Sequence, residues 1–386
     1  MVDFSFTDEQ LALQRVAREF AEKELAPRAD EFDRTGVLDL AVLKKAADLG
    51  FLGMTIPQEY GGLGLDAVSV GLILAELTKG CASTAGTIAV HAGIVSTHLV
   101  EAGSAEQKAR YLPDMAAGRK IGAWCLTEPG AGSDPLSMQT TAVCDGDAWV
   151  LSGEKMFITN GGFADVYIVM AKTDPAAFHK GVSAFLVERD MGVQVSREED
   201  KIGIRASSTA ALKFDNVRVP KENLLGREGH GLYGALSALN MERLTMAAVS
   251  TGGIEKALEQ SLEHAKRREQ FGKPVYKFQQ VYGMLVQLKE WAECAKLLWL
   301  KAAWEKEQGK DYGAAASLAK MYAAEASKQA ALTAIQVHGG LGMIREAGVE
   351  RGLRDSLVGS IGGGTTQVQK MQVARGLGLD INPYLD

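Results

Sequence analysis

The hydrophobic periodicity changes twice along these 386 residues, and this limits the folds that the chain can adopt. Up to about residue 120, apolar residues recur at spacings of three and four, which is typical of amphipathic helices. Between about residues 121 and 220, short runs of apolar and β-branched residues predict strands, with a hairpin turn at Asp145-Gly146. The helical period returns after Gly231 and persists almost to the end. This order predicts an α+β protein.

The chain is too long for one simple core, so we expect it to divide into packed units. The periodicity predicts an N-terminal all-α domain at residues 1–120, a middle β-barrel or sandwich domain at 121–230, and a C-terminal α-helical domain, a four-helix bundle, at 231–386. Thr7 and Gln10 predict a capping box at the first helix. No G-x-G-x-x-G segment opens a helix after a strand, which argues against a Rossmann dehydrogenase.

The charge balance and the apolar runs restrict the partners and the location. The formal net charge is -6, so we expect neither a nucleic-acid partner nor attraction to an anionic membrane. Residues 1–10 carry acids and no apolar run, which is unlike a signal peptide. The longest apolar stretch, at about 88–100, is too short to span a bilayer and predicts a buried helix. We expect a bacterial cytoplasmic protein, with a processed mitochondrial protein as the alternative.

The cysteines and histidines do not form a metal-binding pattern. The four cysteines lie far apart without a C-x-x-C pair, which fits unpaired thiols in a reducing compartment. His91 and His98 are seven residues apart and could share a helix face, but no third ligand accompanies them. We therefore expect no bound metal.

Five segments occur in an order that is similar to the acyl-CoA dehydrogenase family, and the resemblance covers essentially the whole chain. One such segment has little weight, whereas five in order on the expected elements are a specific pattern. The segments are WCLTEPGAGSD at 124–134, GEKMFITNGG at 153–162, REQFG at 268–272, QVHGG at 336–340 and GTTQ at 364–367.

The resemblance implies a noncovalently bound FAD. A glycine-rich turn at 130–133 suits a pyrophosphate cofactor, because glycine lets backbone amides approach it closely. By resemblance, Thr127 meets the pyrimidine edge of the flavin, Phe157 lies on the flavin face where many relatives carry Trp, and Thr159 bonds near N5. In the segments at 124–134 and 153–162, the other cofactor contacts that the resemblance assigns are Trp124, Leu126, Gly132, Ser133 and Ile158.

A second group of cofactor residues implies an oligomer. In the family, the arginine at the Arg268 position reaches the FAD of a neighbouring subunit, as do Gln336, Gly339 and Gly340, and the assembly is usually a dimer of dimers, a homotetramer. A guanidinium suits a pyrophosphate because it offers planar, charge-assisted hydrogen bonds. The alternative for Arg268 is a solvated basic helix end. Further cofactor contacts assigned by resemblance are Gln270, Phe271, Phe278, Gln279, Thr365 and Gln367.

The catalytic base departs from the commonest family pattern. Many members carry a glutamate immediately before the Gly-Thr of the last segment, and here that position is Gly363, which cannot accept a proton. After Gly231, one helix face carries five apolar residues and one carboxylate, and burial among apolar residues raises the pKa of a carboxyl group, as a general base requires. This stripe consists of Leu232, Ala235, Leu239, Glu242, Met246 and Val249.

We therefore predict Glu242 as the base. The isovaleryl-CoA and long-chain branches of the family carry theirs at a similar position, with a small residue at the Gly363 position. The alternative is that Glu242 only pairs with Arg243 or a neighbouring helix. The resemblance implies that Glu242 takes the α-proton of an acyl-CoA thioester, that the backbone N–H of Gly363 helps to bind the enolate oxygen, and that the β-hydride passes to flavin N5.

The resemblance leaves the substrate open. Ser133, Asn240, Arg243 and Gly364 are the expected CoA contacts, with the subunit interface as the alternative for Arg243. His91 is either an acyl-pocket residue or a core histidine with a backbone partner. Electron-transferring flavoprotein is the implied electron acceptor, and the position of the base favours a medium, branched or cyclic acyl group. The alternatives are an oxidase, an acyl-carrier-protein dehydrogenase and an alicyclic acyl-CoA dehydrogenase on the same fold; a nucleic-acid-binding relative is disfavoured by the acidic balance.

Overall fold

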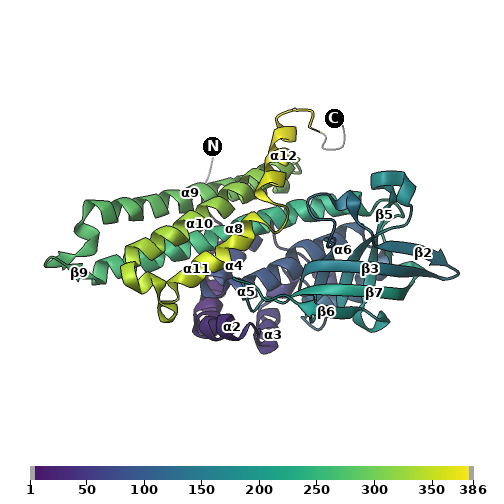
Figure 1. The fold of residues 1–386 in the computed structure, drawn as a ribbon, viewed down its shortest axis with the longest axis horizontal. Coiled ribbons are helices and arrows are strands. Elements are labelled where there is room, and N and C mark those ends of the chain that lie inside the picture. Colours follow the sequence, from purple (N-terminus) through teal and green to yellow (C-terminus); the bar gives the residue numbers. More distant parts are fainter. Residues whose placement is uncertain (1–4, 382–386) are drawn as a thin grey trace.

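The computed structural model describes residues 5–381, with long helices towards one end of the longest axis and the β-sheet at the other (Figure 1). The predicted order is confirmed, because helices form the first part, strands the middle and long helices the last. Within residues 5–381, no helix is long and apolar enough to cross a membrane.

Local capping interactions set the boundaries of the first helices. The hydroxyl of Thr7 accepts a hydrogen bond from the Gln10 amide at 3.2 Å, and the Gln10 side chain accepts one from the Thr7 amide at 3.1 Å, which confirms the capping box. The apolar stretch at 88–100 is helical and buried as predicted, with a π-helical segment η5 (Ala89–Val95) at its centre. The helices of this part are α1 (Asp8–Phe20), α2 (Ala29–Thr35), α3 (Leu40–Asp48), α4 (Ala67–Gly80), α5 (Ala82–Ile88), α6 (Ser96–Ala102) and α7 (Ala105–Ala116).

The middle part is an eight-stranded mixed sheet in the order β6-β7-β3-β2-β4-β5-β8, with β1 paired to β4. A single pairing of Thr141 with Lys172 joins β2 to β4, and residues on both sides of this joint pack into one core, as Trp149 does against Phe185 at 5.4 Å. The strands are β1 (Gly122–Cys125), β2 (Thr141–Asp145), β3 (Ala148–Thr159), β4 (Val166–Lys172), β5 (Val182–Glu188), β6 (Gln194–Glu198), β7 (Thr209–Pro220) and β8 (Leu224–Leu225).

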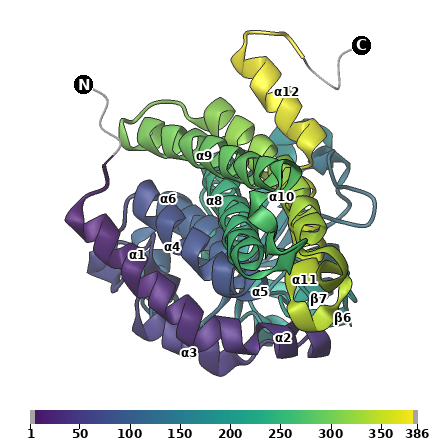
Figure 2. The ribbon, with the colours of Figure 1, turned by 90° about the vertical axis from the view of Figure 1, so that its left-hand side faces the viewer.

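The last part consists of long helices packed side by side, and α8 lies between α4 and α10 (Figure 2). The close approach of α4 depends on Gly252, because a Cβ there would overlap the backbone carbonyl of Ala75. The helices are α8 (Gly231–Arg267), α9 (Gln279–Glu307), α10 (Gly313–His338), α11 (Val349–Ser356) and α12 (Thr366–Gly376), with a two-stranded β9 (Glu269–Gln270) and β10 (Lys273–Pro274) between α8 and α9.

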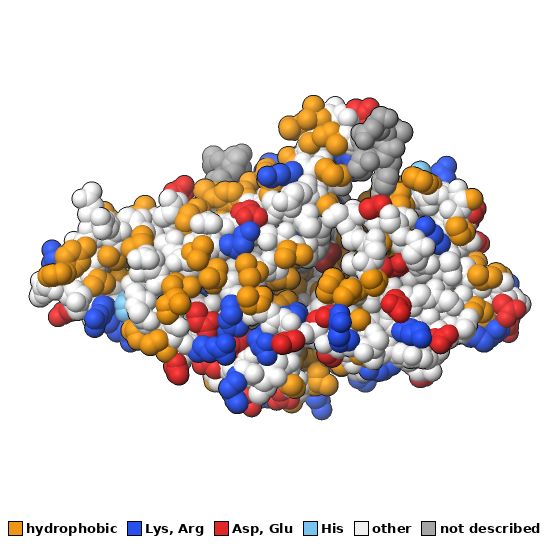
Figure 3. Space-filling view, in the orientation of Figure 1, with side chains coloured by type: hydrophobic (Ala, Val, Ile, Leu, Met, Phe, Trp, Pro, Cys, Tyr) orange, Lys and Arg blue, Asp and Glu red, His pale blue; other side chains and the backbone are white. Residues whose placement is uncertain are grey.

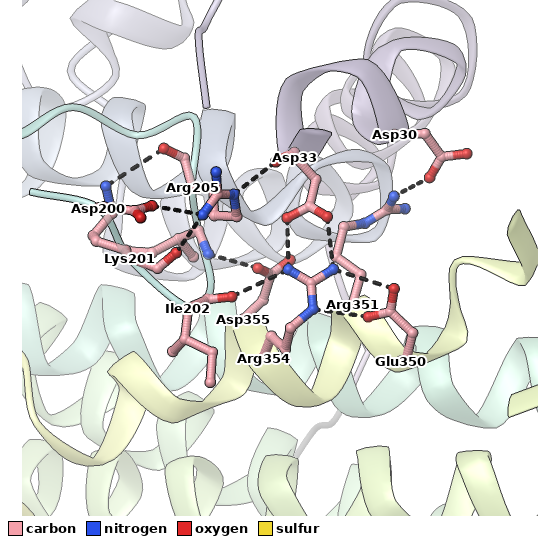
Figure 4. Close-up of polar contacts among 11 residues, drawn as sticks. Asp30, Asp33, Asp200, Lys201, Ile202, Arg205, Glu350, Arg351, Arg354 and Asp355 are labelled. Carbon is pink, nitrogen blue, oxygen red and sulfur yellow. Dashed lines mark hydrogen bonds and ion pairs between the residues drawn. The ribbon is translucent and has the colours of Figure 1, made fainter. Parts of the chain in front are cut away.

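A charged network joins all three parts where α2, the loop before β7 and α11 meet (Figure 4). Arg354 donates two hydrogen bonds to the Asp33 carboxylate, at 2.8 and 2.6 Å, and two to Glu350, at 2.8 and 3.3 Å. Arg205 donates to the backbone carbonyl of Asp33, and the Ile204 amide donates to Asp355. Residues remote in sequence thereby fix the relative positions of the three parts.

Replacement of Arg354 by Met is predicted to destabilise the fold by about 2 kcal/mol, because it leaves the half-buried Asp33 carboxylate without its main partner. Burial alone would raise the pKa of Asp33, but Arg354 and the charges of Arg351 and Arg205 hold it below its usual 3.8. The stabilisation is therefore complete above about pH 4 and is lost as the pH falls through the lowered pKa.

Urea unfolding of the wild type and R354M at several pH values measures this effect, and the difference should narrow below pH 4. R218M is the matched control, since Arg218 forms an exposed ion pair with Asp145 and its loss should cost less than about 0.5 kcal/mol. Equal stabilities of R354M and R218M would show that the network does not hold the parts together.

Candidate active site

The loop after β1 and the end of β3 form one side of the candidate site. The Met156 amide donates to the Thr127 carbonyl at 2.8 Å, so the segments at 124–134 and 153–162 lie together. Trp124 and Leu126 pack in the same apolar cluster as Leu232 and Leu239 of α8. The sequence segments that resemble flavin-binding motifs are thus placed beside the helix face that carries Glu242.

A buried ion pair between Lys155 and Glu128 holds the loop after β1 in place. Lys155 is 0% exposed, and its Nζ donates to Glu128 Oε1 at 2.7 Å and to the Leu126 carbonyl at 3.1 Å. Glu128 also accepts hydrogen bonds from the amides of Gln139 and Thr140. Burial would raise the pKa of Glu128, but the Lys155 charge and these amides outweigh burial and lower it, so the carboxylate stays charged.

An irregularity in β3 presents Phe157 outward. The pairing of β3 with β7 shifts between Lys155 and Ile158, and Phe157 lies there at φ 59, with its side chain 58% exposed. Ile158 is buried in the core of the sheet, so its backbone is the part that is available for the cofactor contact that the resemblance assigns to it. Thr159 follows, half-buried at the end of the strand.

Glu242 lies directly against Gly363. The glycine has φ 62, and a Cβ built on it would lie 3.4 Å from Glu242 Cδ, 3.5 Å from Glu242 Oε1 and 2.7 Å from Met246 Sδ. Burial raises the pKa of Glu242 above its usual 4.5, and the charges of Arg243 and Lys320 oppose this rise. The carboxyl group thus occupies the space that a side chain at position 363 would enter.

The backbone turn at Gly363 and Gly364 is held by its carbonyl groups. Lys320 Nζ donates to the Gly364 carbonyl at 2.6 Å, and Gln369 Nε2 donates to the carbonyls of Gly363 and Gly364, both at 2.9 Å. Within the part of the chain that the structure describes, the Gly363 amide donates no hydrogen bond. Thr365 then caps α12 by accepting from the Val368 amide, whereas Gln367 is exposed on its first turn.

The expected CoA contacts differ in their surroundings. Arg243 is only 8% exposed and donates to Asn240 Oδ1 at 2.6 Å, while its Nε has no partner among residues 5–381. Ser133 is exposed in the loop after β1, and Gly364 is half-buried beside Gly363. The structure thus brings Asn240, Arg243 and Glu242 together on α8, with a buried guanidinium that has capacity for a further acceptor.

His91 is held by backbone partners at both of its ring nitrogens. It is fully buried, its Nδ1 accepts from the Gly122 amide at 2.9 Å, and its Nε2 therefore carries the proton and donates to the Met115 carbonyl at 3.1 Å. Burial lowers its pKa to about 4, so it stays neutral. With both nitrogens bonded to the backbone, the structure favours the core-histidine alternative over a substrate contact.

The second group of predicted cofactor residues, apart from Thr365 and Gln367 beside the Gly363 turn, lies at the far end of the molecule. Glu242 and Arg268 are 26 residues apart along α8, which corresponds to about 39 Å at the helical rise. Figure 1 places β9 at one end and the sheet at the other, and Figure 3 shows apolar side chains gathered at the β9 tip, where Phe271 is 93% exposed.

The rest of this group lies around the same tip. The His264 and His338 rings stack at 4.4 Å, which brings the ends of α8 and α10 together. Phe278 lies edge-on to Phe271 at 5.9 Å. The exposed members of the group are Arg268, Gln270, Phe271, Gln279, Gln336, Gly339 and Gly340.

Family profiles match three successive parts of the chain: the acyl-CoA dehydrogenase N-terminal domain at residues 7–119, the middle domain at 123–217 and the C-terminal domain at 229–378. The chain belongs to the acyl-CoA dehydrogenase family. It is therefore an FAD-dependent oxidoreductase.

Relatives resemble the chain over nearly its full length. The short-chain specific acyl-CoA dehydrogenase of Clostridium acetobutylicum is 39% identical and aligns over 97% of this chain and 99% of its own. The structure of butyryl-CoA dehydrogenase from Megasphaera elsdenii superposes with a TM-score of 0.96 at 38% identity, covering 98% of this chain and 100% of that one. A prolyl acyl carrier protein oxidase superposes with a TM-score of 0.94 at 34% identity, covering 97% and 100%.

The substrates in the names of these relatives differ from those of the family branches that the predicted position of the base resembles. Two of the three relatives are named for short-chain or butyryl thioesters, whereas Glu242 resembles the base of the isovaleryl-CoA and long-chain branches. Overall similarity therefore supports the acyl-CoA dehydrogenase family as a whole and not that branch. Across residues 5–381, no group of three or more His, Cys, Asp or Glu side chains could hold a metal ion.

Sequence reasoning missed Lys320, Gln369 and the Lys155–Glu128 pair. The kind of pattern that identified Glu242 could have identified Lys320 as well. Lys320 is a charged residue within a stripe of small residues on α10, formed by Ala316, Ala319 and Ala323. The periodic stripe locates the buried face, but it does not name the carbonyl group that the lysine bonds.

Replacement of Lys155 by Met is predicted to cost about 3–5 kcal/mol, because it leaves Glu128 buried and charged without its counter-ion. The double variant K155M/E128Q removes the charge as well and should recover a substantial part of this loss. Urea unfolding of the two variants and the wild type measures the difference. A double variant as unstable as K155M alone would contradict the pairing as the source of the effect.

Proposed function

We propose that the chain removes two hydrogens across the Cα–Cβ bond of an acyl-CoA thioester, with Glu242 as the base that takes the α-proton. The observation that carries this proposal is the contact between the Glu242 carboxyl group and Gly363, the position at which many family members have their catalytic glutamate. The carboxyl group of Glu242 on α8 lies where the side chain of a glutamate at 363 would begin, and the glycine at 363 leaves room for it. The raised pKa of Glu242 suits proton abstraction near neutral pH.

The residues around Glu242 supply the remaining requirements of proton abstraction. The α-proton of a thioester is weakly acidic, so the carbonyl oxygen needs a fixed donor as negative charge develops on it. The unbonded amide of Gly363 is the donor that we assign to this oxygen. The buried Arg243 lies beside Glu242 and binds the carrier portion of the substrate together with Asn240 and Ser133.

FAD fits the residues around the loop after β1. Open space surrounds the Cβ positions of Gly130 and Gly132, Phe157 offers an exposed ring, and Thr127 offers a half-buried hydroxyl. When bound, FAD supplies the acceptor for the β-hydrogen, which leaves with its electron pair as a hydride. Glu242 keeps the α-proton until product release, so the two hydrogens and two electrons are accounted for.

The acyl group and its carrier are proposed from the relatives. Similarity to proteins named for short-chain and butyryl thioesters favours a short acyl group, whereas the position of Glu242 favours a branched one. CoA is the proposed carrier. The similarity to a prolyl acyl carrier protein oxidase supports a second candidate, oxidation of a carrier-protein thioester.

The assembly, acceptor and location complete the proposal. Because about 39 Å of helix separates Arg268 from Glu242, the far-end group reaches an active site only in another copy of the chain. We assign it to the FAD of a neighbouring subunit in a homotetramer. Electron-transferring flavoprotein is the proposed acceptor, and the bacterial cytoplasm the proposed location.

Anaerobic titration with butyryl-, isovaleryl-, octanoyl-, palmitoyl- and cyclohexanecarboxyl-CoA is predicted to bleach the flavin absorbance with one of the first two. E242Q should bind FAD and the same thioester but reduce the flavin about 10²–10⁴-fold more slowly, because an amide cannot accept the α-proton. In the wild type, the rate should rise with pH as Glu242 ionises, with a midpoint above pH 4.5.

E255Q is the control, since Glu255 lies on the same helix and pairs with Lys79 away from Gly363. Near-wild-type reduction by E242Q would remove Glu242 from its role. If the protein binds flavin but none of the five thioesters bleaches it, a carrier-protein thioester becomes the favoured substrate. Rapid peroxide formation in air would favour an oxidase.

Hybrid assemblies test the shared cofactor site. R268M/F271A damages the far end and T127A/T159A damages the loop beside the sheet, so neither variant alone should retain FAD. Co-expression of the two should restore about a quarter of the wild-type flavin content, since half of the chains combine at random into hybrid pairs with one intact site. Flavin content no higher than in the separate variants would contradict a site shared between copies.

A further inference from the structure

Lys320 is a buried cation that the proposed reaction does not use. It lies on α10 among buried alanines, is 1% exposed, and reaches the turn before α12. Its Nζ donates to the Gly364 carbonyl at 2.6 Å. A lysine is rarely so deeply buried without a partner that compensates for the loss of water.

The turn that Lys320 holds is the one that contains the unbonded amide. Gly363 and Gly364 adopt φ 62 and 91, a conformation with little steric restriction for glycine. Lys320 and Gln369 together fix both carbonyl groups of this turn toward the protein interior. The Gly363 amide belongs to the preceding peptide plane, so the fixed Gly363 carbonyl restricts its orientation through the φ and ψ angles of Gly363.

The same ammonium acts on the charge of Glu242. Burial lowers the pKa of Lys320 to about 8, so it remains mostly protonated at pH 7; Glu242 and Glu325 oppose this shift and Arg243 adds to it. These are the charged groups that act on it from α8 and α10, and α12 faces it with the neutral Gln369. The Lys320 charge in turn lowers the pKa of Glu242.

We propose that Lys320 is a positioning residue for the dehydrogenation: it holds the Gly363–Gly364 turn so that the Gly363 amide can bind the thioester oxygen, and its charge favours the ionised form of Glu242. The inference rests on the proposed function of Glu242 and Gly363. Lys320 does not touch the substrate. It acts on the Gly363 amide through the backbone of the turn, and it acts on Glu242 through its charge.

Three substitutions separate the two effects. K320M removes both the donor and the charge, K320Q keeps a donor without the charge, and K320R keeps both. K320M is expected to lower kcat about tenfold to a hundredfold with KM changed less than about threefold, since a misplaced donor affects the transition state more than binding. K320Q should lose less and K320R least.

The pH dependence provides a readout that a merely structural role would not change. Loss of the Lys320 charge raises the pKa of Glu242, so the acid limb of the kcat profile should move to higher pH in K320M and K320Q but not in K320R. K301M is the matched control, because Lys301 is an exposed lysine on α9. It should leave kcat and the profile unchanged.

Hydrogen–deuterium exchange without substrate tests the turn independently of activity. Amides of residues 357–369 should exchange faster in K320M than in the wild type and K301M. Unchanged exchange, or an unchanged kcat and acid limb in K320M, would overturn the proposal. If exchange is faster in K320M but no acyl-CoA reduces the flavin of the wild type, the proposed function would be rejected instead. If K320M does not fold, K320Q and K320R decide, and equal acid limbs in these two variants would also overturn the proposal.

Discussion

The close packing of α8 on two sides is the constraint on which the rest of the structure depends. On one side α4 approaches so closely that only glycine fits at 252, and on the other the small residues of α10 lie against it. Such contacts gain dispersion energy over many atoms, and a larger side chain would force the helices apart. Glu242 projects from this fixed helix, so its carboxylate keeps its position relative to both the sheet and the turn at 363.

Electrostatics add a second constraint around Glu242. Its carboxyl group lies among apolar neighbours, and two buried cations, Arg243 and Lys320, act on it from different helices. Burial alone would keep the group protonated, and the cations oppose this. Arg243 follows Glu242 directly on α8, whereas Lys320 comes from α10, remote in sequence, so the balance exists only in the folded protein.

The sequence predicted the features that depend on local chemistry. The Thr7 capping box, the hairpin at Asp145-Gly146 and the stripe around Glu242 are all periodic or short-range patterns, and the structure contains each of them. The inward side chain of Ile158 depends instead on a register shift against β7, which no single strand reveals. Strand β7 is longer than the short strands that the sequence predicts, because β3 pairs along almost all of it.

Long-range partners account for the remaining differences. His91 bonds backbone groups at 115 and 122, and Asp33 meets Arg354 from 321 positions away, so neither partner could be named from spacing. The identity of Glu242 as an odd residue in an apolar stripe was accessible, but its contact with Gly363 was not. Patterns give the face of an element, whereas contacts require the packing of several elements.

The contact between Glu242 and Gly363 also restricts how such a site can change over evolutionary time. A glutamate at 363 would bring its Cβ within 3.4 Å of the existing carboxyl carbon, and two carboxylates that close share a proton rather than ionise together. The two arrangements are therefore alternatives and do not accumulate in one chain. A lineage that moves its base between α8 and the turn at 363 passes through an ancestor with a proton-sharing pair or with no base at all, and both would be poor catalysts. This barrier would tend to hold the base at one of the two positions once a lineage has adopted it.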